Sequence, residues 1–146
     1  MEKEYVDMGL PSGTLWASEN EKGYFNFDEA VEKFGNNLPA RWQFCELVEN
    51  SDCYFDTDEN AFVFKSNFNG NMVKFSTFGG YRISDRNEFI GVDKYCDYWS
   101  RTPHTNGEDA WHISVTNYGS VEPTFLGNRQ YGMSVRLCKL EKNGIK

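Results

Sequence analysis

Long apolar runs are missing from this sequence, and their absence excludes the simplest membrane-spanning element. A transmembrane helix needs roughly 18 or more apolar residues in a row, and no stretch of this chain approaches that length. The first residues also lack the basic leader and the apolar segment of a secretory signal peptide. We therefore expect a chain that is made in the cytoplasm without a signal peptide and does not insert into a membrane.

Positive charge is also scarce. The 146 residues carry 15 Lys and Arg against 22 Asp and Glu, and no basic stripe is present that could meet the phosphates of nucleic acid. The charge is uneven, because residues 1–97 carry 9 basic and 18 acidic side chains whereas residues 98–137 carry 3 of each. The later stretch is therefore neutral on an acidic body, which favours recognition through hydrogen bonds and aromatic rings.

The four cysteines show no metal-binding or redox spacing. No C-x-x-C occurs, so a zinc ribbon or a thioredoxin-type site is not expected. Oxidation of Cys45, Cys53, Cys96 and Cys138 would allow three pairings. Without an export signal, we expect reduced and mostly buried thiols.

Residues 56–60, Asp-Thr-Asp-Glu-Asn, imitate the start of a calcium-binding loop. However, Ala61 stands at the sixth position, where Gly is required, and Asn67 stands at the twelfth, where a bidentate Glu is required. We therefore expect a solvated acidic loop over residues 51–60, with no metal ion and no other cofactor.

A catalytic site would have to combine Cys96 with His104 or His112. A thiol is activated by a nearby His or cation, but both histidines lie where a polar rim is expected. Glu108 and Asp109 are adjacent, so their side chains diverge and fit solvated loop charges better than a glycosidase pair. We therefore expect that the chain is not an enzyme. The alternative is an enzyme whose catalytic site is degenerate.

Two helices are predicted in the first third of the chain. Asn26 and Glu29 form a capping-box pattern, and Phe27, Ala30, Val31 and Phe34 form an apolar stripe that ends before Gly35. A second helix is predicted from Pro39 to about Glu49, with Phe44, Leu47 and Val48 facing inward and Trp42 or Cys45 beside them. Both stripes are typical of core rather than of a cofactor pocket.

Short strands are predicted in the rest of the chain, at residues 5–10, 61–65, 72–75, 110–115 and 132–140. Residues 61–65 and 72–75 form a hairpin through Asn69-Gly70-Asn71, and a polar loop carrying Arg86 is expected over residues 84–97. Gly79-Gly80 lets the chain turn closely against the core. The pattern predicts one α+β domain over residues 1–146, in which two helices pack on short antiparallel strands with long loops, and the closing strand lies near the first.

Residues 98–137 carry the chemistry that an adaptable binding surface needs, and residues 1–97 are their scaffold. Rings supply contact area at low entropic cost, and short polar groups supply hydrogen bonds. Strand alternation places Trp111, Ile113 and Val115 inward and places His112, Ser114 and Thr116 in an exposed row. The predicted ligand-binding residues are Arg101, His104, Asn106, His112, Ser114, Asn117, Tyr118, Phe125, Asn128, Arg129 and Tyr131.

A family resemblance runs along nearly the whole chain. Residues 5–17, Tyr-Val-Asp-Met-Gly-Leu-Pro-Ser-Gly-Thr-Leu-Trp-Ala, resemble the opening signature of the Fibrobacter succinogenes major paralogous domain, which is common in Bacteroidetes and their phages. The later matching landmarks are Leu38-Pro39, Gly80-Tyr81-Arg82, Tyr98-Trp99-Ser100 and Gly132-Met133-Ser134-Val135-Arg136.

The resemblance implies a C-type-lectin-like fold with its termini close together. It also implies similarity to variable proteins that retroelements diversify, in which a rigid scaffold presents variable residues ahead of the closing strand, here residues 101–131. We accordingly expect a non-catalytic, lectin-like receptor-binding module, encoded by a phage or mobile element. It would recognise a protein or glycan on a bacterial surface and would be associated with a virion, or otherwise cytoplasmic.

A structural role is the alternative, in which a virion decoration or assembly subunit docks a neighbouring virion protein, with homo-oligomers possible. Calcium-mediated sugar binding is not expected. The lectins that use it carry Glu-Pro-Asn and a downstream Trp-Asn-Asp, whereas Glu122-Pro123-Thr124 is only a partial match here and no Trp-Asn-Asp follows.

Overall fold

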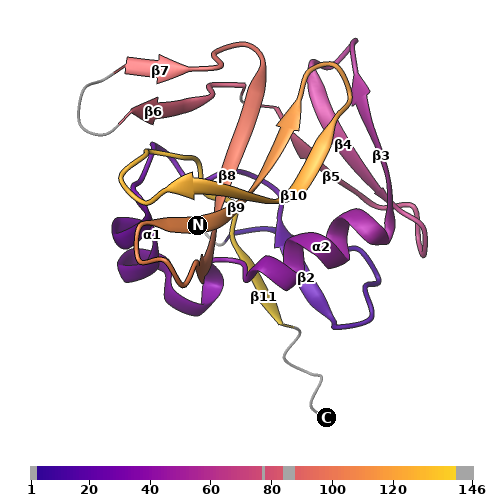
Figure 1. Cartoon of the computed structure of the whole chain (residues 1–146). Helices are drawn as coiled ribbons and strands as arrows, with labels where there is room; N and C mark the ends of the chain where they lie inside the picture. Colours follow the sequence, from indigo (N-terminus) through magenta and orange to yellow (C-terminus); the bar gives the residue numbers. More distant parts are fainter. Residues whose placement is uncertain (1–2, 77, 84–87, 141–146) are drawn as a thin grey trace.

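The computed structural model describes residues 3–76, 78–83 and 88–140, and strands dominate this part of the chain (Figure 1). Helix α1 (Phe27–Phe34) leads through a short 3-10 turn, η1 (Gly35–Asn37), to helix α2 (Arg41–Glu49). The strands in the described residues are β1 (Tyr5–Asp7), β2 (Thr14–Ala17), β3 (Ser51–Asp56), β4 (Ala61–Ser66), β5 (Met72–Phe75), β6 (Tyr81–Ile83), β7 (Glu88–Ile90), β8 (Tyr95–Pro103), β9 (Asp109–Thr116), β10 (Val121–Asn128) and β11 (Cys138–Leu140).

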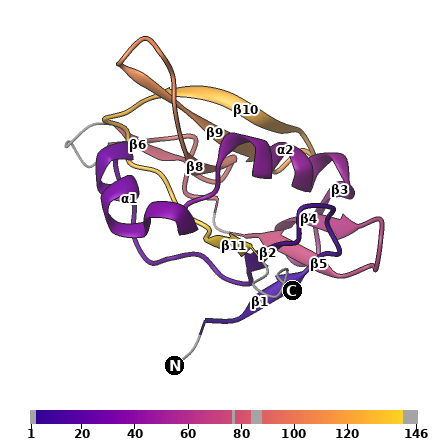
Figure 2. The ribbon, with the colours of Figure 1, turned by 90° about the horizontal axis from the view of Figure 1, so that it is seen from below.

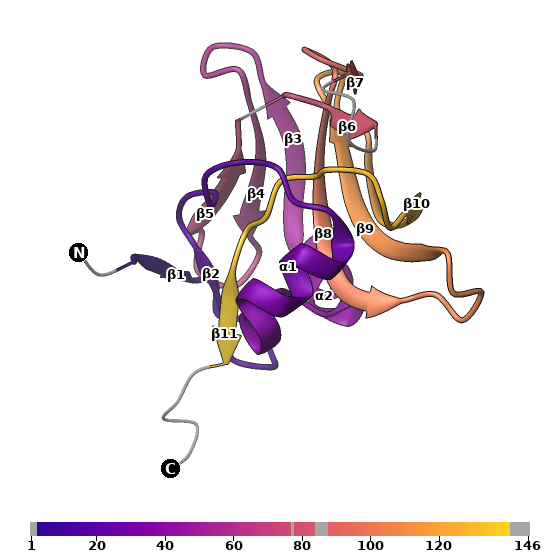
Figure 3. The same ribbon diagram turned by 90° about the vertical axis from the view of Figure 1, so that its left-hand side faces the viewer.

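The strands form four small antiparallel sheets, with the orders β1-β2-β11, β3-β4-β5, β6-β7 and β8-β9-β10. Figure 3 shows the β3-β4-β5 sheet beside the β8-β9-β10 sheet, and both helices lie at the end of the molecule that Figure 2 views. Strand β11 pairs with β2 on the side opposite β1. The first and last strands therefore share one sheet, as predicted.

The expected α+β class with a C-type-lectin-like fold is wrong, because the structure is mostly β. Strands and bridges make up 47% and helices 15% of the described residues. Helices α1 and α2 have only 8 and 9 residues, and no helix within the described ranges is both long enough and apolar enough to cross a membrane. Two segments that were predicted to be loops contain strands, and these strands account for much of the difference.

The first of these segments is β3, which replaces the predicted acidic loop. It pairs with β4 along its whole length. Cys53 and Phe55 pack against the core while Asp52 is exposed, so the strand is apolar on one face and acidic on the other. Asp56 ends the strand, and its Oδ1 accepts two backbone N–H groups of the following turn.

The second segment is residues 84–97, where a polar loop was predicted. It contains β7 and the start of β8, whereas Arg86 lies outside the described residues. Gly80 holds the β6-β7 hairpin against β8, because its N–H donates to the Tyr95 carbonyl at 2.9 Å. Gly80 has a φ of +67°, and a Cβ there would lie 1.9 Å from the Ile90 carbonyl oxygen, so only glycine fits this close approach.

Helix α1 forms as predicted, with both of its ends set by local residues. Asn26 Oδ1 accepts the Glu29 N–H and Glu29 Oε1 accepts the Asn26 N–H, each at 2.9 Å, which completes the capping box. Phe27 and Ala30 are buried, but Val31 is 36% exposed. Val31 stands at the edge of the apolar stripe, so its predicted inward position is wrong.

Helix α2 begins at Arg41, two residues later than predicted, with Ala40 as its N-cap. Ala40 has no side-chain oxygen, so only the Gln43 side chain contributes to this cap, accepting the Ala40 N–H at 2.8 Å. Phe44 and Leu47 are fully buried as expected, whereas Trp42 is exposed.

The closing segment is less regular than predicted, since only its last residues form strand β11. Before it, Gly132, Met133 and Ser134 each make an isolated bridge to a different part of the chain. Met133, Val135 and Leu137 of this segment enter the second of two apolar clusters, which also contains Trp99. The first cluster is larger and lies between α2, the β3-β4-β5 sheet and one face of the β8-β9-β10 sheet.

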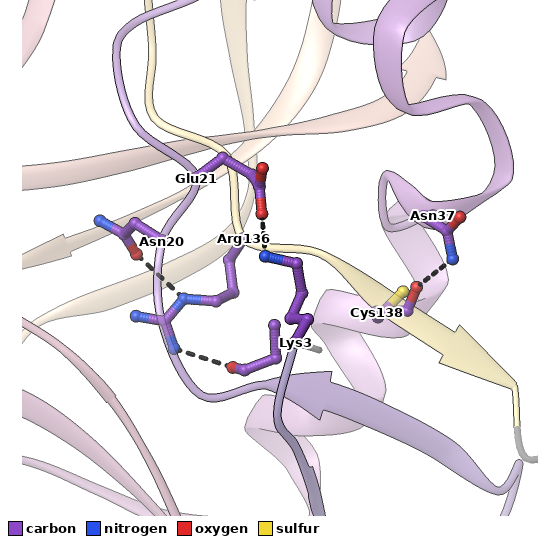
Figure 4. Close-up of polar contacts among 7 residues, drawn as sticks. Lys3, Asn20, Glu21, Asn37, Arg136 and Cys138 are labelled. Atoms are coloured by element: carbon purple, nitrogen blue, oxygen red, sulfur yellow. Dashed lines mark hydrogen bonds and ion pairs between the residues drawn. The ribbon is translucent and has the colours of Figure 1, made fainter. Parts of the chain in front are cut away.

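The buried Arg136 joins several segments of the chain (Figure 4). Its buried guanidinium donates to Asn20 Oδ1 at 2.9 Å, to the Ala17 carbonyl at 3.1 Å and to the Lys74 carbonyl at 2.7 Å. It also lies 5.0 Å from the centre of the Phe75 ring. The Val135-Arg136 part of the closing motif is therefore structural.

Candidate functional site

A cleft of about 850 Å³ lies over one face of the β8-β9-β10 sheet, and we call it the sheet cleft. Strand β8 shows which face this is, because Cys96 and Tyr98 enter the first apolar cluster while Tyr95 and Asp97 line the cleft. The lining residues are Tyr81, Ile90, Tyr95, Asp97, His112, Ser114, Thr116, Tyr118, Ser120, Val121, Glu122, Phe125, Leu126, Gly127, Tyr131 and Met133. The cleft has the size of ordinary ligand sites.

Cross-strand register arranges the floor of the sheet cleft. Ser114 on β9 stands opposite Asp97 on β8 and opposite Glu122 on β10. Directly opposed residues of antiparallel strands project from the same face with their Cβ atoms about 5 Å apart. The floor is therefore crossed by a row of polar side chains with a carboxyl group on either side of a hydroxyl.

His112 lies next to this row and is buried beneath Phe125, with the two rings 5.5 Å apart. Its Nδ1 lies 3.1 Å from the Ile113 carbonyl and 3.7 Å from Asp97 Oδ1. Burial lowers the pKa of His112 to about 4, since the charged ring would lose its hydration. His112 is thus neutral at pH 7, and its contact with Asp97 is a polar contact and not an ion pair.

Asp97 is the most unusual group in the sheet cleft. It is 3% exposed, and its Oδ2 has no hydrogen-bond partner among the described residues. Burial raises the pKa of its carboxyl to about 6, against a smaller opposing effect of a hydrogen bond with Ser114. At neutral pH most of the molecules therefore carry a buried negative charge beside the cleft.

The rim of the sheet cleft gathers large apolar side chains in contact with solvent. Tyr118 is 70% exposed and Phe125 is 54% exposed, and Ile90 and Leu126 are exposed beside them. Tyr81 and Tyr131 stack on each other in the wall, with their ring centres 4.8 Å apart. Apolar side chains gathered around one concave site on a protein surface mark a ligand or partner site.

The structure brings five of the predicted binding residues together in the sheet cleft. These five are His112, Ser114, Tyr118, Phe125 and Tyr131. The predicted exposed row of β9 is only partly right, because His112 and Thr116 are buried and Ser114 is half-buried. Trp111, which was predicted to face inward, lies outside the sheet cleft and is half-buried under Arg41 of α2, with the guanidinium 3.6 Å from the ring centre.

The other predicted residues lie elsewhere, and most of them satisfy the chain's own backbone. Asn128 and Arg129 line a second hollow of about 560 Å³ with Asn26, Asp28 and Glu108. Arg129 is committed to structure there, since it donates to the Asp109 and His104 carbonyls at 2.9 and 3.0 Å.

The remaining four predicted residues hold turns or joints. Arg101 donates to the Leu38 carbonyl at 2.8 Å. His104 Nδ1 accepts the Asn106 N–H, and Asn106 Oδ1 accepts the N–H groups of Glu108 and Asp109. Asn117 donates to the Asp93 carbonyl at 2.8 Å. Their polar groups thus bind the backbone of this chain.

Sequence reasoning missed part of the sheet cleft, most importantly Asp97, Tyr81 and Glu122. Asp97 was assigned to a loop and to the scaffold, although Tyr95, Asp97 and Trp99 share one parity in β8 and could have been read as one face. Tyr81 and Ile90 come from the β6-β7 hairpin, which no periodic signal in the sequence indicated.

The structure places Cys96 in the first apolar cluster, on the face of the sheet opposite the cleft that His112 lines. Burial raises the pKa of the Cys96 thiol, which disfavours the reactive thiolate. All four cysteines are thiols, and Cys45 and Cys53 are half-buried. No group of three or more His, Cys, Asp or Glu side chains in the described ranges is placed to hold a metal ion.

Comparisons of this chain with known protein families, with curated proteins and with solved structures found no match.

Proposed function

We propose that this chain is a non-catalytic binding module that uses its sheet cleft to recognise a protein or glycan on a bacterial surface. The observation that carries the proposal is the exposure of Tyr118 and Phe125 at the rim of a large cleft with a polar floor. Burying such rings against a ligand is favourable, and tyrosine adds a hydrogen-bonding group to its apolar ring.

The proposed ligand class comes from the family resemblance of the sequence, which also suggests a phage- or mobile-element-encoded receptor-binding protein. The sheet cleft fits that role physically. Its floor offers hydrogen-bonding groups at fixed positions on a sheet, and its rim offers apolar contact area, which together give orientation and affinity.

The test is a double substitution, Tyr118→Ala with Phe125→Ala, measured by biolayer interferometry against immobilised bacterial surface polysaccharides and surface proteins. We expect at least a tenfold weaker binding, because truncation of an aromatic contact residue costs about 1–2 kcal/mol. The melting temperature should change little, since both side chains are exposed.

The matched control is Phe68→Ala. Phe68 is 57% exposed but lies in the turn between β4 and β5, away from the sheet cleft, so this variant should bind like the wild type. Unchanged binding by the double variant would contradict the proposal.

A further inference from the structure

Among the described residues that line the sheet cleft, none is a positive partner for the negative charge of Asp97. No Lys or Arg belongs to the described lining, and the neighbouring His112 is neutral at pH 7 for the reason given above. A buried carboxylate is normally paired with a cation or fully hydrogen-bonded. Here one of its oxygens, Oδ2, is shielded from solvent and has no hydrogen bond among the described residues.

A second carboxylate reinforces this charge. Glu122 stands in the same cross-strand row, on the far side of Ser114, and it lines the same cleft. Two carboxyl groups on one floor, separated by two strand spacings or about 10 Å, make the potential inside the cleft negative. Asp97 is buried on the low-dielectric side of the cleft, so it acts more strongly on a charge held there than the solvent-exposed Glu122 does.

Aromatic rings form the remaining walls. Tyr81, Tyr95, Tyr118, Phe125 and Tyr131 all line the sheet cleft. The face of an aromatic ring carries negative electrostatic potential and attracts cations, most strongly organic ammonium groups that shed water easily. Rings beside carboxylates, with no Lys or Arg among the lining residues that the structure describes, form a site that selects positive charge.

We propose that the sheet cleft binds an organic ammonium group of the ligand, with the Asp97 carboxylate as counter-charge and the surrounding rings as walls. The inference rests on the proposed binding function and specifies the chemistry of its ligand. Because Oδ2 is shielded from solvent, the carboxylate acts on the cation through its field and through the neighbouring Ser114 hydroxyl. Such an ammonium group can come from a lysine side chain or from an unacetylated amino sugar.

The experiment compares amines with their neutral counterparts by chemical-shift changes in NMR titrations of the whole chain. The probes are tetramethylammonium, Nα-acetyl-lysine amide and glucosamine, and the matched neutral probes are Nα,Nε-diacetyl-lysine amide and N-acetylglucosamine. We expect tetramethylammonium and at least one of the two amines to bind at millimolar concentrations, about tenfold more tightly than the acetylated counterpart. Preference for the lysine probe indicates a protein ligand, and preference for glucosamine indicates a glycan.

Asp97→Asn should weaken the binding of the amines about tenfold, whereas Asp52→Asn, an exposed position on β3, should leave it unchanged. If Asp97→Asn does not fold, the comparison of amines with acetylated probes on the wild type still tests whether the cleft prefers an ammonium group. Equal binding of charged and acetylated probes, or no binding of any amine, overturns the proposal. If surface ligands still bind in a manner that depends on Tyr118 and Phe125, the binding function stands and only its ammonium chemistry fails.

Discussion

At the scale of single residues, Asp97 and His112 form a pair whose pKa values move in opposite directions. Burial raises the pKa of Asp97 from 3.8 to about 6 and lowers that of His112 from 6.5 to about 4. Within this window the folded state still holds a proton on Asp97 that the unfolded chain has released. The Asp97 contribution to the free energy of unfolding therefore falls as the pH rises. The His112 contribution rises over nearly the same window, because the unfolded chain loses its extra proton. Each change amounts to about 3 kcal/mol, so the two nearly cancel.

The substitution Asp97→Asn separates the two contributions. The variant keeps only the rising His112 contribution, so its stability relative to the wild type should increase by about 2–3 kcal/mol between about pH 4 and about pH 6. Urea unfolding at several pH values measures this difference. Cys96 and Tyr81 also interact with Asp97, but the pKa of each is raised above an ordinary value of 9.0 or 10.0, outside the window.

The exposed variant Asp52→Asn serves as the control and should follow the wild type at each pH. Glu122 is present in both proteins and does not enter the comparison. A stability difference between Asp97→Asn and the wild type that does not change with pH would contradict the opposed contributions.

Only some residues of the sheet cleft could be predicted from the sequence. Tyr118 and Phe125 could be identified because large rings beside turn residues are unusual on a surface without a partner. Asp97 was missed, because the parity of β8 shows which residues share its face but not which face packs on the core. Arg101, Asn106 and Asn117 were overestimated as binding residues, since polar side chains often bind backbone groups of their own chain, as these do.

At the scale of elements, α1 was predictable because its signals are local. A cap, an apolar stripe and a terminating glycine all lie within ten residues of each other. Strand β3 was not predictable, because its conformation is fixed by pairing with β4 and not by its own composition. Four acidic residues between positions 51 and 60 suggested a loop. Asp52 lies on the solvent face of β3, Asp56 ends this strand, and Asp58 and Glu59 lie in the turn that follows it. The mostly β class of the fold follows from such non-local pairings.

The capping box offers a test at this scale. Asn26→Ala removes the side-chain acceptor for the Glu29 N–H and should lower the free energy of unfolding by about 1 kcal/mol. Urea denaturation checks the value. Glu32→Ala, an exposed position on the same helix, should change stability by less than about 0.5 kcal/mol, and equal losses in the two variants would show that the cap contributes nothing.

At the scale of the whole molecule, Arg136 connects parts of the chain that are distant in sequence. One planar guanidinium binds an acceptor from the end of β2, one from the loop after it and one from β5. A lysine ammonium keeps the charge but cannot reach three acceptors spread over a planar fork. The substitution would therefore leave buried carbonyl groups without a donor.

We expect Arg136→Lys to lower the free energy of unfolding by about 3 kcal/mol, in the range found when one partner of a buried charged network is lost. Thermal and urea unfolding measure the loss. Arg101→Lys is the matched control, because Arg101 is only half-buried and donates to carbonyls of one segment, and it should cost clearly less. A loss below about 1 kcal/mol at Arg136 would mean that water or other donors replace the guanidinium.

The alternation of side chains along β8 and β9 has a consequence for evolvability. The same strands that fix the core through one face carry the sheet cleft on the other, so the two sets of positions can change independently. Tyr118, Glu122, Phe125 and Leu126 form a compact set whose codons lie within one short cassette of the gene. A combinatorial library over this cassette would explore new ligands while the rest of the chain serves as a constant display frame.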